Sequence, residues 1–152
     1  MHAGVIVSLI SALFAGLLAG EEFVVRYGVR GPITTLDDDA HIRVRQALIR
    51  TLRILVPSIF LPTLVSAVTA TAVHGIDGSF AVRCVAVGAL LVWFAVTLGG
   101  TAPINKAAMS WAPGAPPVTW RAQVRRWERL DTIRAWAAVV AFALLLTALP
   151  SS

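Results

Sequence analysis

Hydrophobic and charged positions follow one another in long blocks along this chain. Four stretches contain no Asp, Glu, Lys or Arg, and they cover residues 1–20, 54–75, 84–105 and 135–152. A helix of roughly 20 apolar residues crosses a hydrocarbon core of about 30 Å. The pattern predicts an all-α integral membrane protein, a four-helix bundle with transmembrane spans at about 3–24, 54–74, 80–104 and 131–149. We treat all 152 residues as a single membrane domain.

The composition agrees with this interpretation. Hydrophobic residues make up 57% of the chain and charged residues only 14%, too few to cover a soluble domain of this size. The first uncharged stretch resembles a secretory signal peptide, but its positive charges follow the apolar run instead of preceding it. We therefore expect four spans and no cleaved segment.

The positive charges are unevenly distributed between the connections. Eleven Lys and Arg residues lie between spans one and two or between spans three and four, whereas the link between spans two and three carries only Arg83. Positively charged loops stay in the cytoplasm. The distribution predicts a multi-pass cell-membrane protein with both termini outside and two cytoplasmic loops. It also accounts for the net charge of +5 without a nucleic-acid partner.

Several short motifs predict where helices begin, end or pack. The Gly and Pro of residues 30–32 predict the end of the first helix. Asp37 to Asp39 suit the N-terminus of the next helix, and we prefer this role to a metal site with His41. Gly16 and Gly20 belong to a stripe of small residues spaced by four, which predicts close helix packing inside the bundle.

Polar side chains lie near the cytoplasmic ends of three predicted spans. The topology places them at one membrane depth. Helical spacing gives each of the three spans one polar face, and we expect these faces to point into the bundle. They carry Glu22 on span one, Thr101 and Asn105 on span three, and Trp127, Asp131 and Arg134 on span four. Glu22 is predicted to pair with Arg134, or with Arg26 one turn away. Two interpretations stay open: an ion-pair clasp that fastens spans one, three and four, or a reactive pocket for a membrane-dissolved substrate.

Four segments resemble the anthrone oxygenase-like membrane proteins, a broad family of small four-helix proteins largely of unknown function. The segments are AGEEF, RQALIRTLRILVPSIFLPTL, TAPINKAAMSW and TWRAQVRRWERLDTIRAW, and they cover nearly the whole chain in the family's order. By this resemblance the family positions are Gly20, Glu22, Pro103, Asn105, Trp111, Trp127 and Arg134. Glu21 falls on a variable position. Relatives often carry His or Asn in place of Asp131, and His-Pro after the first span.

The resemblance also implies an activity, since the members with an assigned reaction oxidise anthrones to anthraquinones. It implies an oxidoreductase that acts on a lipophilic aromatic molecule at the cytoplasmic leaflet, with O2 as co-substrate and no bound cofactor. The implied catalytic residues are Glu22 as base, with Asn105 and Arg134 donating to the developing oxyanion. The implied substrate-binding residues are Trp127, Asp131 and Trp111.

Other functions stay open beside the oxygenase. A metal ion held by Glu22 and Asp131 ranks lower, because no histidine supports it. A non-catalytic membrane scaffold or assembly partner would use the polar cluster only as a structural clasp. A carrier is disfavoured because spans two and four are nearly devoid of polar groups through the membrane depth. The oligomeric state and the identity of the substrate stay undetermined.

Overall fold

The computed structural model describes residues 2–149, and every regular element in that range is helical. In chain order the elements are α1 (His2–Val24), the π-helical turn η1 (Val25–Val29), α2 (Arg30–Thr34), α3 (Asp38–His74), α4 (Phe80–Val96), the π-helical turn η2 (Thr97–Thr101), α5 (Ala102–Ala108) and α6 (Trp120–Thr147). They make four continuous rods that are long and apolar enough to cross a membrane. The all-α prediction is confirmed.

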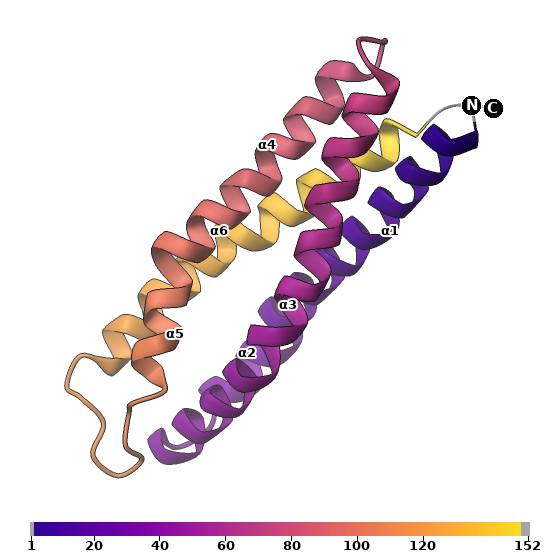
Figure 1. Cartoon of the computed structure of the whole chain (residues 1–152). Helices are drawn as coiled ribbons and strands as arrows, with labels where there is room; N and C mark the ends of the chain where they lie inside the picture. Colours follow the sequence, from indigo (N-terminus) through magenta and orange to yellow (C-terminus); the bar gives the residue numbers. More distant parts are fainter. Residues whose placement is uncertain (1, 150–152) are drawn as a thin grey trace.

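The rods form an elongated bundle in which each one packs mainly against two neighbours (Figure 1). Helix α1 packs against α3 and α6, and α4 packs against α3 and α6 in turn. The start of α1, the end of α6 and the turn between α3 and α4 lie at one end of the bundle (Figure 1). Helix α2, the start of α3 and the loop between α5 and α6 lie at the other end (Figure 1).

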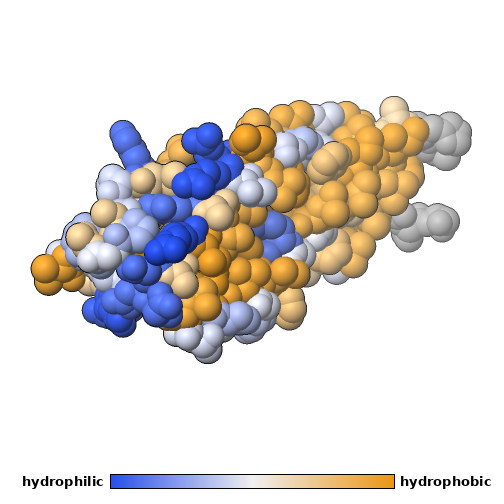
Figure 2. Space-filling view, turned by 90° about the horizontal axis from the view of Figure 1, so that it is seen from below, coloured by the Kyte–Doolittle hydropathy of each residue, from blue (hydrophilic) through white to orange (hydrophobic). Residues whose placement is uncertain are grey.

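The surface divides into a charged end and an apolar body. In Figure 2 the hydrophilic side chains gather at the end that carries α2 and α5, whereas apolar side chains dominate the rest of the visible face. Large apolar residues are exposed along the rods, among them Leu13, Val65 and Leu91. In water such a surface would be unfavourable, but in a bilayer it contacts lipid tails. The position of the charges therefore locates one membrane boundary on the molecule.

The interior of the bundle is built from small residues and a few aromatic ones. Ala15, Leu18 and Ala19 of α1 are buried, and they pack in one core with Phe60 and Trp93. Small side chains let helix backbones approach closely, which is a main source of packing energy in lipid.

The glycine stripe predicted for α1 is only partly inside this core. A methyl group added at Gly16 would lie 3.1 Å from the ring of Phe142, whereas Gly20 is exposed and has nothing within 4 Å of such a group. The prediction for Gly20 is wrong. Each step of four residues overshoots a helical turn by about 40°, so the stripe rotates out of the core as it approaches Gly20.

The end of the first helix is also corrected by the structure. The helix does not stop at residues 30–32 but continues to Thr34, after the π-helical turn η1. The amide of Arg30 donates to the carbonyl of Val25, and Pro32 then lies in the first turn of α2. A proline is tolerated in a first turn, which explains why the predicted break did not occur.

The next helix begins as predicted. The side chain of Asp37 accepts a hydrogen bond of 2.8 Å from the amide of Ala40, which makes it the N-cap of α3. Helix α3 then runs without interruption from the charged end into the second span.

Candidate functional site

A cavity of about 700 Å³ lies at the charged end of the bundle, between all four rods. Its apolar wall is formed by side chains from three of the rods, including Val25, Leu48, Leu52, Val56, Phe60 and Phe94. This volume falls within the range of sites for small organic molecules, about 300–1,000 Å³. The cavity therefore has room for a lipophilic ligand next to the polar residues that the sequence singled out.

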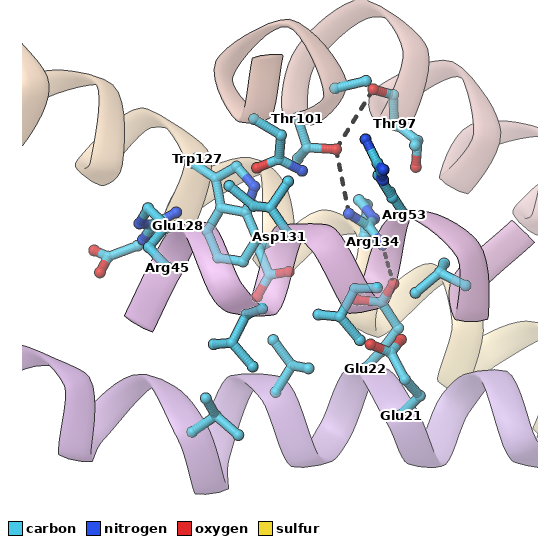
Figure 3. A pocket seen from close by; sticks show the side chains of 18 of the residues that line it. Glu21, Glu22, Arg45, Arg53, Thr97, Thr101, Trp127, Glu128, Asp131 and Arg134 are labelled. Atoms are coloured by element: carbon cyan, nitrogen blue, oxygen red, sulfur yellow. Dashed lines mark hydrogen bonds and ion pairs between the residues drawn. The ribbon is translucent and has the colours of Figure 1, made fainter. Parts of the chain in front are cut away.

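An ion pair between Glu22 of α1 and Arg134 of α6 lies in the wall of this cavity (Figure 3). The same carboxylate oxygen, Oε1, accepts a second hydrogen bond of 2.8 Å from the indole Nε1 of Trp93. Glu22 is only 1% exposed. The predicted pairing across spans one and four is confirmed, and α4 adds a donor to it.

Arg134 is held by three different elements. Besides Glu22, its Nη1 donates to Oγ1 of Thr101 in η2 at 3.2 Å, and its guanidinium lies 4.6 Å from the centre of the Trp93 ring. A buried charge is stable only with such partners, because moving an ion out of water costs several kcal/mol. The cluster thus fastens α1, α4, η2 and α6 together at one depth.

Asp131 differs from Glu22 in that neither of its carboxylate oxygens has a hydrogen bond within the described residues, whereas Oε1 of Glu22 accepts two. Asp131 lines the same cavity one turn before Arg134 and is 1% exposed, yet its Oδ2 makes no hydrogen bond within residues 2–149 (Figure 3). Other buried polar atoms that line the cavity also lack partners among residues 2–149, namely those of Glu21, His41, Arg45, Asn105, Trp127 and Arg134. Since buried polar groups are normally satisfied, such a cluster is typical of a site that receives polar groups of a ligand.

Cationic side chains surround the acidic ones. The guanidinium of Arg45 lies 4.9 Å from the centre of the Trp127 ring, and Arg30 pairs with Glu128 at 2.8 Å. Arg53 and Lys106 also line the cavity, and neither has a carboxylate within ion-pair distance in the described part of the chain. The cavity therefore combines acids, cations and an aromatic face within one enclosure.

The cavity reaches the surface at the side of the bundle. Seven of its eight exposed lining residues lie on two of the four rods: Arg53, Pro57 and Leu61 on α3, and Phe94, Leu98, Lys106 and Met109 on or just after the α4–α5 rod. The eighth, Thr34, ends α2. Leu61 is 56% exposed and Leu98 is 57% exposed. The opening therefore lies mainly between α3 and the α4–α5 rod, on a surface that carries apolar side chains.

Five of the six predicted site residues meet at this cavity: Glu22, Asn105, Trp127, Asp131 and Arg134. Trp111 does not line it. Its ring is buried beside Trp120, with ring centres 6.0 Å apart, and its carbonyl accepts a hydrogen bond of 2.9 Å from Gln46. Trp111 thus fastens the loop after α5 to α3, and its place in the candidate site rested on the family resemblance alone.

Trp93 and Glu21 are among the residues that line the cavity although the sequence did not place them in the site. Trp93 lies four residues before Thr97 and eight before Thr101, so extending the polar stripe of span three by one more turn would have found it. Glu21 follows a different direction from Glu22, about 100° round the helix. The cavity is wide enough to border both sides of α1 here, and Glu21 contributes a buried Oε2 without a partner.

No group of three His, Cys, Asp or Glu side chains within residues 2–149 is arranged to hold a metal ion. The carboxylates of Glu22 and Asp131 are therefore without the additional ligand that a typical metal site requires.

Four apolar rods with a polar-walled cavity at one end define a multi-pass membrane protein with a candidate site at the charged end of its bundle. The model of the anthrone oxygenase family matches residues 46–144, which is more than half of the chain. The protein therefore belongs to the anthrone oxygenase family, as its sequence motifs suggested. The matched range includes Asn105, Trp127, Asp131 and Arg134 and leaves Glu22 outside it. No curated protein and no solved structure matches the chain.

Proposed function

We propose that this protein is a cell-membrane oxygenase that oxidises a lipophilic, anthrone-like aromatic molecule in the cavity described above. The observation that carries the proposal is a buried carboxylate without a partner, that of Asp131, facing an apolar cavity beside a fixed guanidinium, that of Arg134. Membership of the anthrone oxygenase family supports the choice of reaction. The apolar wall supports the choice of a flat, lipophilic substrate.

The reaction needs a base and a stabilised anion. An anthrone has an acidic CH2 group between two aryl rings, opposite its carbonyl. Transfer of one proton to the base gives an anthranolate, whose carbon forms a bond with O2 to give a hydroperoxide after protonation. Loss of the second C–H proton, with cleavage of the O–O bond, releases one water molecule and leaves the quinone carbonyl. One O2 is consumed, and no bound cofactor enters the balance.

Two carboxylates are candidates for the base. The resemblance implied Glu22, but its carboxylate is ion-paired with Arg134 and also accepts a hydrogen bond from Trp93, and an ion-paired carboxylate is a weak proton acceptor. Asp131 lines the cavity, and its buried Oδ2 has no hydrogen-bond partner among the described residues. We therefore assign proton abstraction to Asp131 and the positioning of Arg134 to Glu22. Asn105 and Arg134 then donate to the developing oxyanion, and Trp127 stacks on the rings.

The side opening supplies a route for such a substrate. A molecule dissolved among lipid tails reaches the cavity between α3 and the α4–α5 rod, where Leu61 and Leu98 are exposed. The excess of positive residues at this end supports a cytoplasmic position of the cavity, with both termini outside. The substrate then enters from the inner leaflet without crossing water.

The test is an assay of purified protein in detergent with an anthrone under air, following quinone absorbance and O2 uptake above the uncatalysed rate. Asp131→Asn should lower the rate by at least about a hundredfold, the usual contribution of a general base. Asp38→Asn, which changes a half-exposed carboxylate outside the cavity, is the matched control. If Glu22→Gln abolishes turnover and Asp131→Asn does not, Glu22 is the base. Treatment with a metal chelator separates a cofactor-free reaction from a metal-assisted one.

A second candidate function is a non-catalytic scaffold. It is favoured by one observation, that the contacts of Glu22 and Arg134 already fasten α1, α4, η2 and α6. In that case the unchanged protein would not oxidise the substrate above the uncatalysed rate, and Asp131→Asn would have no effect on that rate. Glu22→Gln would lower only the stability of the fold. Anthrone is the first probe, so the same variants would be compared on other lipophilic aromatic substrates.

A further inference from the structure

A second hollow, of about 300 Å³, lies beside the first cavity and has a different character. Its lining consists of Arg26 and Arg30 from the first rod together with Arg125, Glu128, Arg129 and Thr132 from α6. Four arginines face one glutamate, so the hollow carries an excess of three positive charges. Nothing in the proposed reaction uses this hollow.

Most of these arginines have no ion-pair partner. Arg30 binds Glu128 at 2.8 Å, which neutralises one charge. Within residues 2–149, Arg26, Arg125 and Arg129 have no carboxylate within 4.0 Å. Arg26 donates to the hydroxyl of Thr132, and its Nε is buried without a partner. Like charges held this close repel one another, so an anion that joins them is favoured.

The depth of the hollow indicates which anion. Helices α1 and α6 are antiparallel neighbours, and the predicted spans end at residue 24 and begin at residue 131. Arg26 and Arg129 each lie two residues beyond these points, about 3 Å along a helix, whereas Arg30 and Arg125 each lie six residues beyond, about 9 Å. The headgroup layer of a bilayer extends roughly 5–7 Å beyond the hydrocarbon core. The backbones of Arg26 and Arg129 therefore lie within the headgroup layer, and those of Arg30 and Arg125 lie about 2–4 Å beyond it, from where their long side chains can extend back to the lipid phosphates.

We propose that this hollow binds the phosphate of an anionic lipid headgroup, such as that of phosphatidylglycerol. Guanidinium groups bind phosphate oxygens with two parallel hydrogen bonds, and several can share one phosphate. Arg30 forms part of both cavities, and its pair with Glu128 lies between them. The bound lipid would therefore form one wall of the candidate site while contacting none of its apolar interior.

The test compares lipid binding by protein variants at two neighbouring arginines of α6. Arg125 lines the hollow and Arg126 does not, although both are exposed. Native mass spectrometry and thermal unfolding in a neutral detergent are followed while phosphatidylglycerol, phosphatidylcholine or inorganic phosphate is added. Each arginine near a membrane surface contributes about a fivefold effect, so the double variant R125Q/R129Q should bind phosphatidylglycerol about 25-fold more weakly. The control R50Q/R126Q should bind it within about twofold of the unchanged protein.

Each remaining outcome is decisive. Equal weakening by the two double variants would reduce the effect to general surface charge and overturn the site. Equal stabilisation by phosphatidylcholine would overturn the requirement for an anion, and saturation by inorganic phosphate at similar concentrations would overturn the lipid assignment. If R125Q/R129Q does not fold, the single variants R125Q and R126Q carry the same comparison. Anthrone oxidation plays no part in this test. A protein that does not oxidise anthrone can therefore still bind the lipid as proposed.

Discussion

Trp93 of α4 donates a hydrogen bond of 2.8 Å to Glu22 of α1, although 71 residues separate them in the chain. The indole also stacks on Phe60, with ring centres 4.4 Å apart, and lies beneath the guanidinium of Arg134. One side chain thus joins the apolar core to the polar cluster. Trp93 fixes the orientation of Glu22, and through it the orientation of Arg134.

The first prediction tests this contact. Trp93→Phe keeps an aromatic ring against Phe60 but removes the donor to Glu22. The free energy of unfolding should fall by about 1.5–3 kcal/mol, the range for a hydrogen bond to a charged group. Trp136→Phe is the control, because Trp136 is 56% exposed. Thermal unfolding in detergent measures both variants, and an equal effect of the two would contradict the role assigned to Trp93.

The second prediction concerns the ion pair of Glu22 and Arg134. Glu22→Gln and Arg134→Met should each cost about 3–5 kcal/mol, because each leaves a buried charge without its partner. The double variant should be more stable than the sum of the two losses by at least about 1 kcal/mol. A thermodynamic cycle from unfolding measurements gives this coupling. Arg43→Met, which removes a largely exposed partner of Asp39, should cost less than about 1 kcal/mol. Additive losses at Glu22 and Arg134 would show that the two charges do not stabilise each other.

The third prediction uses two adjacent glycines of η2. A methyl group at Gly100 would lie 2.7 Å from Cδ1 of Leu130, whereas one at Gly99 would meet nothing within 4 Å. Gly100→Ala should therefore destabilise the packing of η2 on α6 by about 1–3 kcal/mol, and Gly99→Ala should be neutral or slightly stabilising. The melting temperatures of the two variants are compared with that of the unchanged protein. If both behave alike, η2 does not contact α6 as closely as described.

The fourth prediction concerns orientation in the membrane. With Cys84 replaced by Ser, single cysteines are placed at Ile76, in the turn between α3 and α4, and at Val118, in the loop before α6. Ile76 is 91% exposed and Val118 is 101% exposed, so access to both depends only on the side of the membrane. An impermeant maleimide added to whole cells should label the first and spare the second. The reverse labelling would place both termini inside.

The fifth prediction is a pH dependence at the α3–α4 turn. The hydrogen bond of 2.7 Å from Arg83 lowers the pKa of Asp77 below its usual value. The pair therefore stabilises the fold above the ordinary aspartate pKa, about 3.9, and this stabilisation is lost as the pH falls through the lower pKa of the folded protein. Asp77→Asn should melt at a lower temperature than the unchanged protein at pH 7, and the difference should shrink below about pH 4. A difference that is constant with pH would contradict the pairing.

The sequence by itself determined the four spans, because uncharged runs of about 20 residues have few alternatives to membrane-spanning helices. It also predicted the pairing of Glu22 with Arg134. Spans one and four carry these residues at matching depths, and an unpaired charge at that depth is costly. Asp37 as a helix cap followed from local chemistry alone.

Only the tertiary structure decided which side chains share the cavity. The π-helical turns η1 and η2 alter the helical register at the points where α1 and α4 reach the site, and no residue pattern in the chain predicted them. The packing of the four rods against one another determines three further features. Gly20 is exposed, Glu21 lines the cavity, and Trp111 lies in a separate cluster. Helical spacing relates residues within one rod, whereas distances between rods are set by side-chain packing across the whole bundle.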